Sequence, residues 1–245
     1  MKTLSILVLL IVAASTASAK DDITKELITS NGKTRAYYLY VPATAKADAP
    51  VPLVVLLHGS GHVGMSLAEK WKDLAKKENF IIAAPDSSNP QVWAMPQDGP
   101  EYLRDLVEEL KKKYPINPRK VYLFGHSAGA SFALGIGIME SEYFAATAIH
   151  AGALPGSNRQ MVEIAKRKIP MYIQVGDRDS FAPLNVVRAT RDFLKDNDFP
   201  IELTEIPNHD HWYYDMAPKI NLAAWEFLKK YQLDQDPVYR KFNFN

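Results

Sequence analysis

The segment Gly125-His126-Ser127-Ala128-Gly129 decides how the rest of this chain is interpreted. It follows the apolar residues 121–124 and precedes residues 130–134, which are compatible with a helix. A Gly-x-Ser-x-Gly segment between a strand and a helix is typical of a sharp turn that presents the serine hydroxyl, because the flanking glycines leave room for neighbouring backbone. The pentapeptide alone is a weak signal, since small residues are common. Whether this segment holds a functional serine depends on the side chains that the rest of the chain brings to it.

The segments around this pentapeptide alternate between strand-like and helix-like patterns. The expected strands cover residues 23–29, 36–41, 53–57, 80–84, 121–124, 145–149, 171–175 and 201–206, and the expected helices cover about 66–77, 101–114, 128–139, 159–167, 184–194 and 217–230. The first two strands flank Asn31-Gly32, a hairpin signal, so we expect an antiparallel pair there. The later alternation predicts parallel strands with helices on both faces of one sheet.

The composition is that of an ordinary compact α/β protein, with 47% hydrophobic residues. The chain of 245 residues carries 29 basic and 28 acidic side chains, and no strongly basic face is indicated. Nucleic-acid binding is therefore not expected. The chain has no cysteine, so its stability must come from the core and not from disulfides.

The first nineteen residues have the pattern of a signal peptide. Lys2 is a short basic region, residues 4–14 are apolar, and Ala17-Ser18-Ala19 is a small-residue cleavage site. The apolar part is too short to span a bilayer comfortably, and no cysteine follows the cleavage site that could carry a lipid. We therefore expect residues 1–19 to be removed. Residues 20–245 should form a single exported domain, secreted or periplasmic, without a membrane anchor.

Two later segments offer the acid and the base that a serine nucleophile needs. A serine hydroxyl attacks poorly unless a histidine accepts its proton, and a carboxylate holds that histidine in place. Asp177 and Asp179 follow the last but one expected strand, and His209 and His211 follow the last one. Because catalytic groups gather at the carboxyl ends of parallel strands, we expect these side chains beside Ser127.

The chain resembles the α/β-hydrolases of the esterase D, feruloyl esterase and polyhydroxybutyrate depolymerase type. The likeness rests on the serine turn, on Gly176-x-x-Asp179-x-Phe181 and on Asp210-His211-x-Tyr213-Tyr214, and it extends over nearly the whole chain after residue 19. In esterase D the aspartate three residues after the glycine is the acid, and the histidine directly after the aspartate is the base. The resemblance therefore implies an α/β-hydrolase fold with Ser127, Asp179 and His211 as the catalytic triad.

Two alternatives stay open at this stage. Asp177 is the alternative acid, although it falls closer to the end of the strand. His209 is the alternative base, because related hydrolases often place a Gly-His pair at this point. Alternatively, His209 is a supporting or surface histidine on the same loop.

The resemblance also implies an oxyanion hole built from backbone N–H groups. Donors held in place in advance stabilise the tetrahedral oxyanion of ester hydrolysis, and each is worth about 3 kcal/mol. One donor is the amide after the nucleophile, here Ala128. The other comes from a His-Gly loop such as Leu57-His58-Gly59-Ser60-Gly61-His62. We assign it to Ser60, with Gly61 as the alternative, and expect His58 to shape the loop through a backbone hydrogen bond.

Three further side chains are candidate substrate contacts. Trp212, Trp93 and His62 lie in loops at the same end of the sheet as the expected triad, although the tryptophans could equally anchor the core and His62 could be a plain surface histidine. No metal and no cofactor are expected, since the chain has neither cysteine ligands nor a His-Glu-x-x-His helix.

The segment between two expected strands limits the substrate. Only residues 151–170 separate the strands at 145–149 and 171–175, which leaves no room for a large cap over the site. An open site favours esters that are soluble or attached to a polymer. We therefore expect a secreted serine esterase that acts on short-chain, acetyl or feruloyl esters of polysaccharide.

Other functions compete with this one. A polyester depolymerase of the polyhydroxybutyrate type suits the sequence nearly as well. A serine peptidase of the prolyl oligopeptidase kind shares the fold and the triad, but usually carries an extra gating domain. From a different class, the chain could be a non-catalytic binding protein on a hydrolase scaffold. The acyl group, the alcohol and the oligomeric state are not predicted.

Overall fold

Eight strands form one sheet in the computed structural model, which describes residues 22–244. Their order across the sheet is β1-β2-β4-β3-β5-β6-β7-β8. The strands are β1 (Thr24–Ser30), β2 (Lys33–Tyr40), β3 (Val51–Leu57), β4 (Ile81–Pro85), β5 (Ile116–His126), β6 (Ala146–His150), β7 (Met171–Gly176) and β8 (Ile201–Ile206). β1 and β2 are antiparallel, β2 is antiparallel to β4, and all other pairs are parallel. This is the mostly parallel sheet that the sequence predicted.

The hairpin between β1 and β2 follows from two residues. Asn31 and Gly32 have φ angles of 49° and 72°, and a two-residue hairpin turn of type I′ needs positive φ at both central residues. Asparagine and glycine adopt this conformation at little cost. The antiparallel edge expected from Asn-Gly is therefore present.

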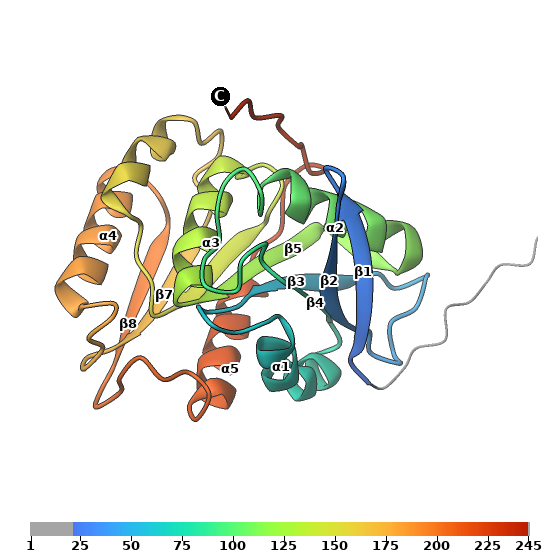
Figure 1. Ribbon diagram of the computed structural model, residues 1–245, viewed down its shortest axis with the longest axis horizontal. Coiled ribbons are helices and arrows are strands. Elements are labelled where there is room, and N and C mark those ends of the chain that lie inside the picture. The colour runs from blue at the N-terminus through green and yellow to red at the C-terminus, as the bar shows by residue number, and fades with distance from the viewer. Residues whose placement is uncertain (1–21, 245) are drawn as a thin grey trace, which may run out of the picture.

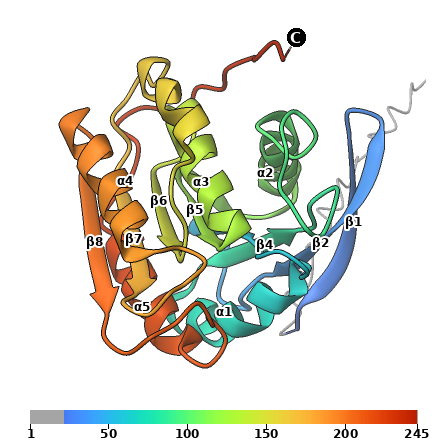
Figure 2. The same ribbon diagram turned by 60° about the vertical axis from the view of Figure 1, so that its left-hand side comes forward.

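Helices cover both faces of the sheet (Figures 1 and 2). The helices are α1 (Met65–Glu78), α2 (Glu101–Lys113), α3 (Ala128–Met139), α4 (Leu184–Asp196) and α5 (Ala217–Leu228). One buried cluster joins the sheet to α2, α3 and α4, and a second joins its other face to α1 and α5. Leu53 to Leu57 are fully buried in β3, because layers lie on both sides of it.

One element differs in type from the sequence prediction. The segment that we expected to be a helix around residues 159–167 is a 3-10 helix, η1 (Gly156–Glu163). It begins with Gly-Ser-Asn, three residues that favour turns over α-helix. β5 is also longer than the expected strand, because it pairs with Val51 from Ile116 onward before a register shift. Residues 151–170 contain no other helix, so no large cap is present there, as expected.

Residues 1–19, interpreted as a signal peptide, lie outside the described residues. Within residues 22–244, none of the helices combines the length and the apolar character needed to cross a membrane.

The segment after α5 returns across the surface to the carboxyl end of α3. The amide of Val238 donates to the carbonyl of Glu142 (3.0 Å), and the amide of Arg240 lies 3.4 Å from Oε2 of Glu140. The Glu140 residue is 1% exposed, and its other carboxylate oxygen, Oε1, has no hydrogen-bond partner among the described residues. Burial accordingly raises the pKa of Glu140 to about 8.

We predict that Glu140→Gln makes the protein more stable than the wild type in alkali. The folded protein favours the neutral carboxyl of Glu140. The wild type therefore keeps its full stability below about pH 5 and loses part of it as the pH rises towards 8 and this carboxyl ionises. The variant should unfold with a free energy about 1–4 kcal/mol higher at pH 9, and the difference should shrink at pH 5. Urea unfolding at both pH values measures this. Glu142→Gln, which removes a partly exposed carboxyl two residues away, is the control. An equal effect of Glu140→Gln at both pH values would contradict the assignment.

Candidate active site

Ser127 lies at the sharp turn between β5 and α3. Its backbone has φ 55° and ψ −117°, a conformation that few residues other than glycine adopt. The Ser127 amide donates a 3.0 Å hydrogen bond to the carbonyl of His150, at the end of the neighbouring strand β6. Strain of this kind amounts to about 1–3 kcal/mol and persists only where the surroundings enforce it.

The two glycines of the pentapeptide make this turn sterically feasible. A Cβ atom on Gly125 would lie 2.2 Å from the carbonyl oxygen of Gly129. A Cβ atom on Gly129 would lie 2.1 Å from the carbonyl oxygen of Leu57, at the end of β3. Any larger residue at either position would push the start of α3 away from the sheet. The glycines therefore hold Ser127 against the loop that follows β3.

Ser127, His211 and Asp179 form one hydrogen-bonded row. Nε2 of His211 lies 2.8 Å from Oγ of Ser127, and Nδ1 of the same ring lies 2.8 Å from Oδ2 of Asp179. Asp179 follows β7 and His211 follows β8, so the carboxyl ends of three strands supply the row. These are the three residues that the sequence singled out, and the structure brings them together.

The carboxylate of Asp179 is held in its ionised form. Its side chain is fully buried, and burial by itself would raise the pKa. The hydrogen bond to His211 and those from the amides of Ala182 (2.8 Å) and Phe181 (2.9 Å) outweigh the burial and lower the pKa below its ordinary value. A buried negative charge beside Nδ1 favours a protonated imidazole. The row can therefore accept a proton from Ser127.

His58 fixes the backbone of the loop after β3. Its Nδ1 lies 2.9 Å from the carbonyl oxygen of Gly59, which can only accept, so Nδ1 carries the proton. Its Nε2 accepts a 3.2 Å hydrogen bond from the amide of Ser87, and burial lowers the pKa of the ring. In a trans peptide the N–H points away from the C=O. Because the Gly59 carbonyl points towards the His58 ring, the Ser60 N–H of the same peptide group points away from it. Ser60 lines the cavity at Ser127.

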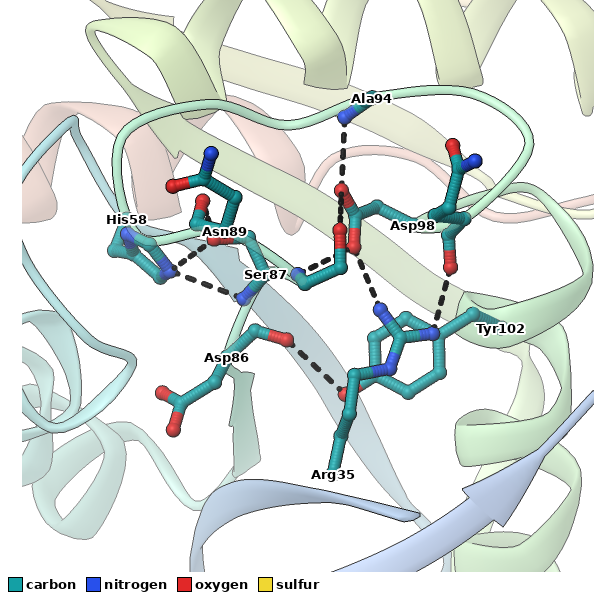
Figure 3. A network of polar contacts seen from close by, with 10 residues as sticks. Arg35, His58, Asp86, Ser87, Asn89, Ala94, Asp98 and Tyr102 are labelled. Carbon is teal, nitrogen blue, oxygen red and sulfur yellow. Dashed lines mark hydrogen bonds and ion pairs between the residues drawn. The ribbon is translucent and has the colours of Figure 1, made fainter. Parts of the chain in front are cut away.

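A buried ion pair anchors the segment that holds His58 (Figure 3). Asp98 is fully buried and lies 2.6 Å from Nη1 of Arg35. The same carboxylate accepts hydrogen bonds from the amides of Ser88 (2.7 Å) and Ala94 (2.8 Å). The loop between β4 and α2 is therefore tied at both ends. It places Ser87 and Trp93 against His58, the ring nitrogen of Trp93 donating to the His58 carbonyl (2.8 Å).

The model of the dienelactone hydrolase family matches residues 83–227, more than half of the chain. The chain belongs to the dienelactone hydrolase family. The match contains the serine turn, Asp179 and His211, and it places the chain in the α/β-hydrolase superfamily that the sequence resemblance implied.

Individual relatives of this dienelactone hydrolase family member are distant. NocK of Nocardia uniformis subsp. tsuyamanensis is 28% identical over 166 residues, which are 63% of this chain and 48% of NocK. A poly(3-hydroxybutyrate) depolymerase of Ralstonia pickettii is 27% identical over 155 residues, which are 54% of this chain and 32% of the depolymerase. The matches thus span half or less of the length of these two proteins.

The fold is shared with solved esterases. The structure of a ferulic acid esterase from Anaeromyces mucronatus in complex with ferulic acid has a TM-score of 0.66 with 20% identity, over 86% of this chain and 90% of that chain. At this identity the likeness shows the fold alone. It confirms the α/β-hydrolase architecture predicted from the sequence.

A cavity of about 390 Å³ opens at Ser127. Among the expected substrate contacts, Trp212 and His62 line it, as do Gly59 and Ser60 of the expected oxyanion loop. The sequence did not indicate five of the lining side chains, which are His126, Ser180, Phe181, Asp210 and Tyr214. Phe181 and Tyr214 were quoted only as motif residues, although each lies within three residues of Asp179 or His211.

Trp93 is not at this cavity. It lines a separate cavity with Met95 and Phe132, and its ring packs on Phe132 at 5.4 Å between centroids. The exposed fraction of Trp93 is 6%, so it anchors the loop between β4 and α2. The expectation that Trp93 contacts substrate is therefore not supported by its position, because its indole is committed to packing and to His58.

The two alternative residues also lie outside the row. Nε2 of His209 lies 3.1 Å from Nε2 of His150 and not at the serine. Asp177 is exposed at the end of β7, and its amide donates to the carbonyl of Ile206. Within residues 22–244, the side chains that hydrogen-bond His211 are those of Ser127 and Asp179, and not those of Asp177 or His209. Within residues 22–244 no group of three metal-ligating side chains converges on one point.

We predict that His211→Ala and His209→Ala differ sharply in activity. Loss of the imidazole at 2.8 Å from the serine removes its proton acceptor, so kcat for an ester should fall by about 10⁴ or more. His209→Ala should retain at least a tenth of the wild-type kcat. Steady-state kinetics of both purified variants, with circular dichroism to confirm folding, measures this. The opposite ranking would identify His209 as the base.

Proposed function

We propose that this chain is an exported serine carboxylic-ester hydrolase in which Ser127, His211 and Asp179 form the catalytic triad. One observation carries the proposal: the His211 imidazole lies 2.8 Å from the serine hydroxyl on one side and 2.8 Å from a buried carboxylate on the other. A serine held in this way is activated, because its proton can pass to the imidazole as its oxygen attacks. Membership of a hydrolase family supports the same conclusion.

Acylation begins when Oγ of Ser127 attacks the carbonyl carbon of the ester and its proton moves to Nε2 of His211. The carbonyl oxygen becomes an oxyanion, for which we assign the amides of Ser60 and Ala128 as donors. Ala128 is the first residue of α3, and the first N–H groups of a helix have no acceptor within it. When the tetrahedral intermediate collapses, the imidazolium gives its proton to the leaving alkoxide and the alcohol departs.

Deacylation repeats these steps with water. The water oxygen attacks the acyl carbon while His211 accepts its proton, and the second tetrahedral intermediate expels Oγ of Ser127, which takes the proton back. The carboxylic acid then leaves. Asp179 remains ionised throughout and stabilises each imidazolium. The proposed cycle uses no metal and no cofactor.

The charges around the cavity favour uncharged substrates. Among residues 22–244, no lysine or arginine lines the cavity, and Asp210 adds a negative charge at the rim. A carboxylate on the acyl group or on the alcohol would lose hydration without gaining a cation. Neutral esters therefore suit this site better than anionic ones.

The rim of the cavity favours esters that are attached to a polymer. Phe181 is 79% exposed and Trp212 is 52% exposed, and aromatic faces of this kind bind apolar groups and the apolar faces of sugars. The short segment between β6 and β7 leaves the serine accessible. We propose acetyl or feruloyl esters on polysaccharide as the substrate, with fragments of a polyester such as polyhydroxybutyrate as the second candidate, which the depolymerase relative favours.

The proposed place of action is outside the cytoplasm. The pattern of residues 1–19 indicates a signal peptide, so the mature enzyme would begin at Lys20 and be secreted or periplasmic. A polymer substrate is consistent with this, because such polymers cannot enter a cell intact.

We predict that the mature chain hydrolyses neutral esters and that Ser127→Ala does not. The panel is p-nitrophenyl acetate, butyrate and octanoate, methyl ferulate, acetylated xylan and hydroxybutyrate oligomers. Ser127→Ala should lose at least a factor of about 10⁴ in kcat, because the nucleophile is gone. The ranking among the last three substrates separates polysaccharide esters from polyesters. Ser180→Ala, at another serine that lines the cavity, is the matched control and should remain active. If the wild type cleaves none of these esters, the proposed function is wrong.

A further inference from the structure

Three buried histidines form a hydrogen-bonded chain behind the serine. Nδ1 of His126 lies 3.1 Å from Nδ1 of His150, and Nε2 of His150 lies 3.1 Å from Nε2 of His209. His126 and His150 are register partners on β5 and β6, and His209 comes from the loop after β8. Their exposed fractions are 5%, 0% and 7%. The triad described above uses none of these rings.

The rings of His126 and His150 are uncharged at neutral pH. Burial, with His211 nearby, lowers the pKa of His126 to about 3. Burial, with His126 and His209 nearby, lowers the pKa of His150 well below its ordinary value. A charged ring here would also repel the His211 imidazolium, whose ring centroid is 5.3 Å from that of His126.

Neutrality allows only two arrangements of protons along the chain. A neutral imidazole has one N–H and one acceptor nitrogen, and His150 uses both of its nitrogens. Both hydrogen bonds must therefore point the same way along the chain, from donor to acceptor. If they run towards His126, its Nε2 carries a proton and donates. If they run towards His209, the Nε2 of His126 is an acceptor.

The free nitrogen of His126 lies at the catalytic cavity. His126 is one of the lining residues, and its Nε2 has no hydrogen-bond partner among residues 22–244. A Cβ built on Gly59 would lie 3.5 Å from this nitrogen and 3.3 Å from Cβ of Ser127. Nε2 of His126 therefore lies between the oxyanion loop and Ser127. It is beside the ring of His211, which returns the proton to the leaving alcohol.

We propose that Nε2 of His126 hydrogen-bonds a hydroxyl group of the substrate alcohol next to the scissile ester, so that the enzyme selects esters of polyhydroxylated alcohols. This inference rests on the proposed esterase function and deepens it. A hydroxyl both donates and accepts, so it satisfies Nε2 in either arrangement of the histidine chain. An ionised group would face an uncharged ring in a buried position, which costs desolvation without a counter-charge. His150 acts as a positioning residue, because it holds Nδ1 of His126 and leaves Nε2 for the ligand.

The test compares two esters that differ only in hydroxyl groups, glycerol 1-acetate and propyl acetate. For the mature wild type, kcat/KM should be about tenfold higher for the glycerol ester, the effect of one additional hydrogen bond in a desolvated site. His126→Phe keeps an aromatic ring between Tyr213 and His150 but removes both nitrogens, so the ratio should fall to about one. His150→Phe should lower the ratio in the same direction. Glu142→Gln, at a residue that does not line this cavity, should keep the wild-type ratio.

A second measurement does not require the His126 and His150 variants to fold. In ¹⁵N-histidine-labelled Ser127→Ala protein, glycerol 1-acetate should shift the Nε2 resonance of His126, and propyl acetate should shift it much less. Equal ratios in the wild type and in folded His126→Phe would overturn the inference, as would equal shifts with the two esters. Absence of any hydrolysis by the wild type would instead contradict the esterase function, and the resonance measurement would still decide the role of His126.

Discussion

The left-handed backbone conformation at Ser127 is the constraint on which the rest of the structure depends. With φ 55° the chain turns from β5 into α3 within one residue, and the serine hydroxyl projects from the carboxyl edge of the sheet. Gly125 and Gly129 make the turn possible by letting backbone approach to distances that a Cβ atom would prevent. The same close approach presses the elbow against the end of β3. The nucleophile and the loop with Ser60 are therefore positioned by one packing contact.

Electrostatic interactions distinguish the histidines that lie at the carboxyl edge of the sheet. His211 faces an ionised, fully buried carboxylate and is the ring that can gain a proton. In the described part of the chain, His126, His58 and His150 hydrogen-bond no carboxylate, and burial lowers the pKa of each. The fold disfavours the charged form of these three rings by burying them, and it gives the carboxylate of Asp179 to His211.

Much of this arrangement could be predicted from particular residues. The pentapeptide at Ser127 has a steric meaning that any chain must obey, and Asp179 and His211 follow strands whose carboxyl ends must meet at the same edge. The hairpin at Asn31-Gly32 is a similar local signal. Each of these features depends on a few neighbouring residues, which is why pattern and resemblance were sufficient.

Other features depend on contacts that no local pattern reveals. The helix expected around residues 159–167 is a 3-10 helix, because the turn-forming residues at its start outweigh the later apolar ones. Trp93 looked like a substrate contact until its packing on Phe132 placed it beside another cavity. The chain of His126, His150 and His209 depends on the register of β5 with β6 and on the path of the loop after β8. The signal for it was three histidines at the ends of strands that share one edge.

The proposed mechanism depends on one property of the protein, the activation of Ser127 as a nucleophile. Its most direct test is treatment of the mature protein with a fluorophosphonate, followed by peptide mass spectrometry, in the wild type and in His211→Ala. We expect a single phosphonylated residue in the wild type, Ser127, and labelling slowed by several orders of magnitude when the imidazole at 2.8 Å is removed. Labelling of another serine, or no labelling of the folded wild type, would contradict the account.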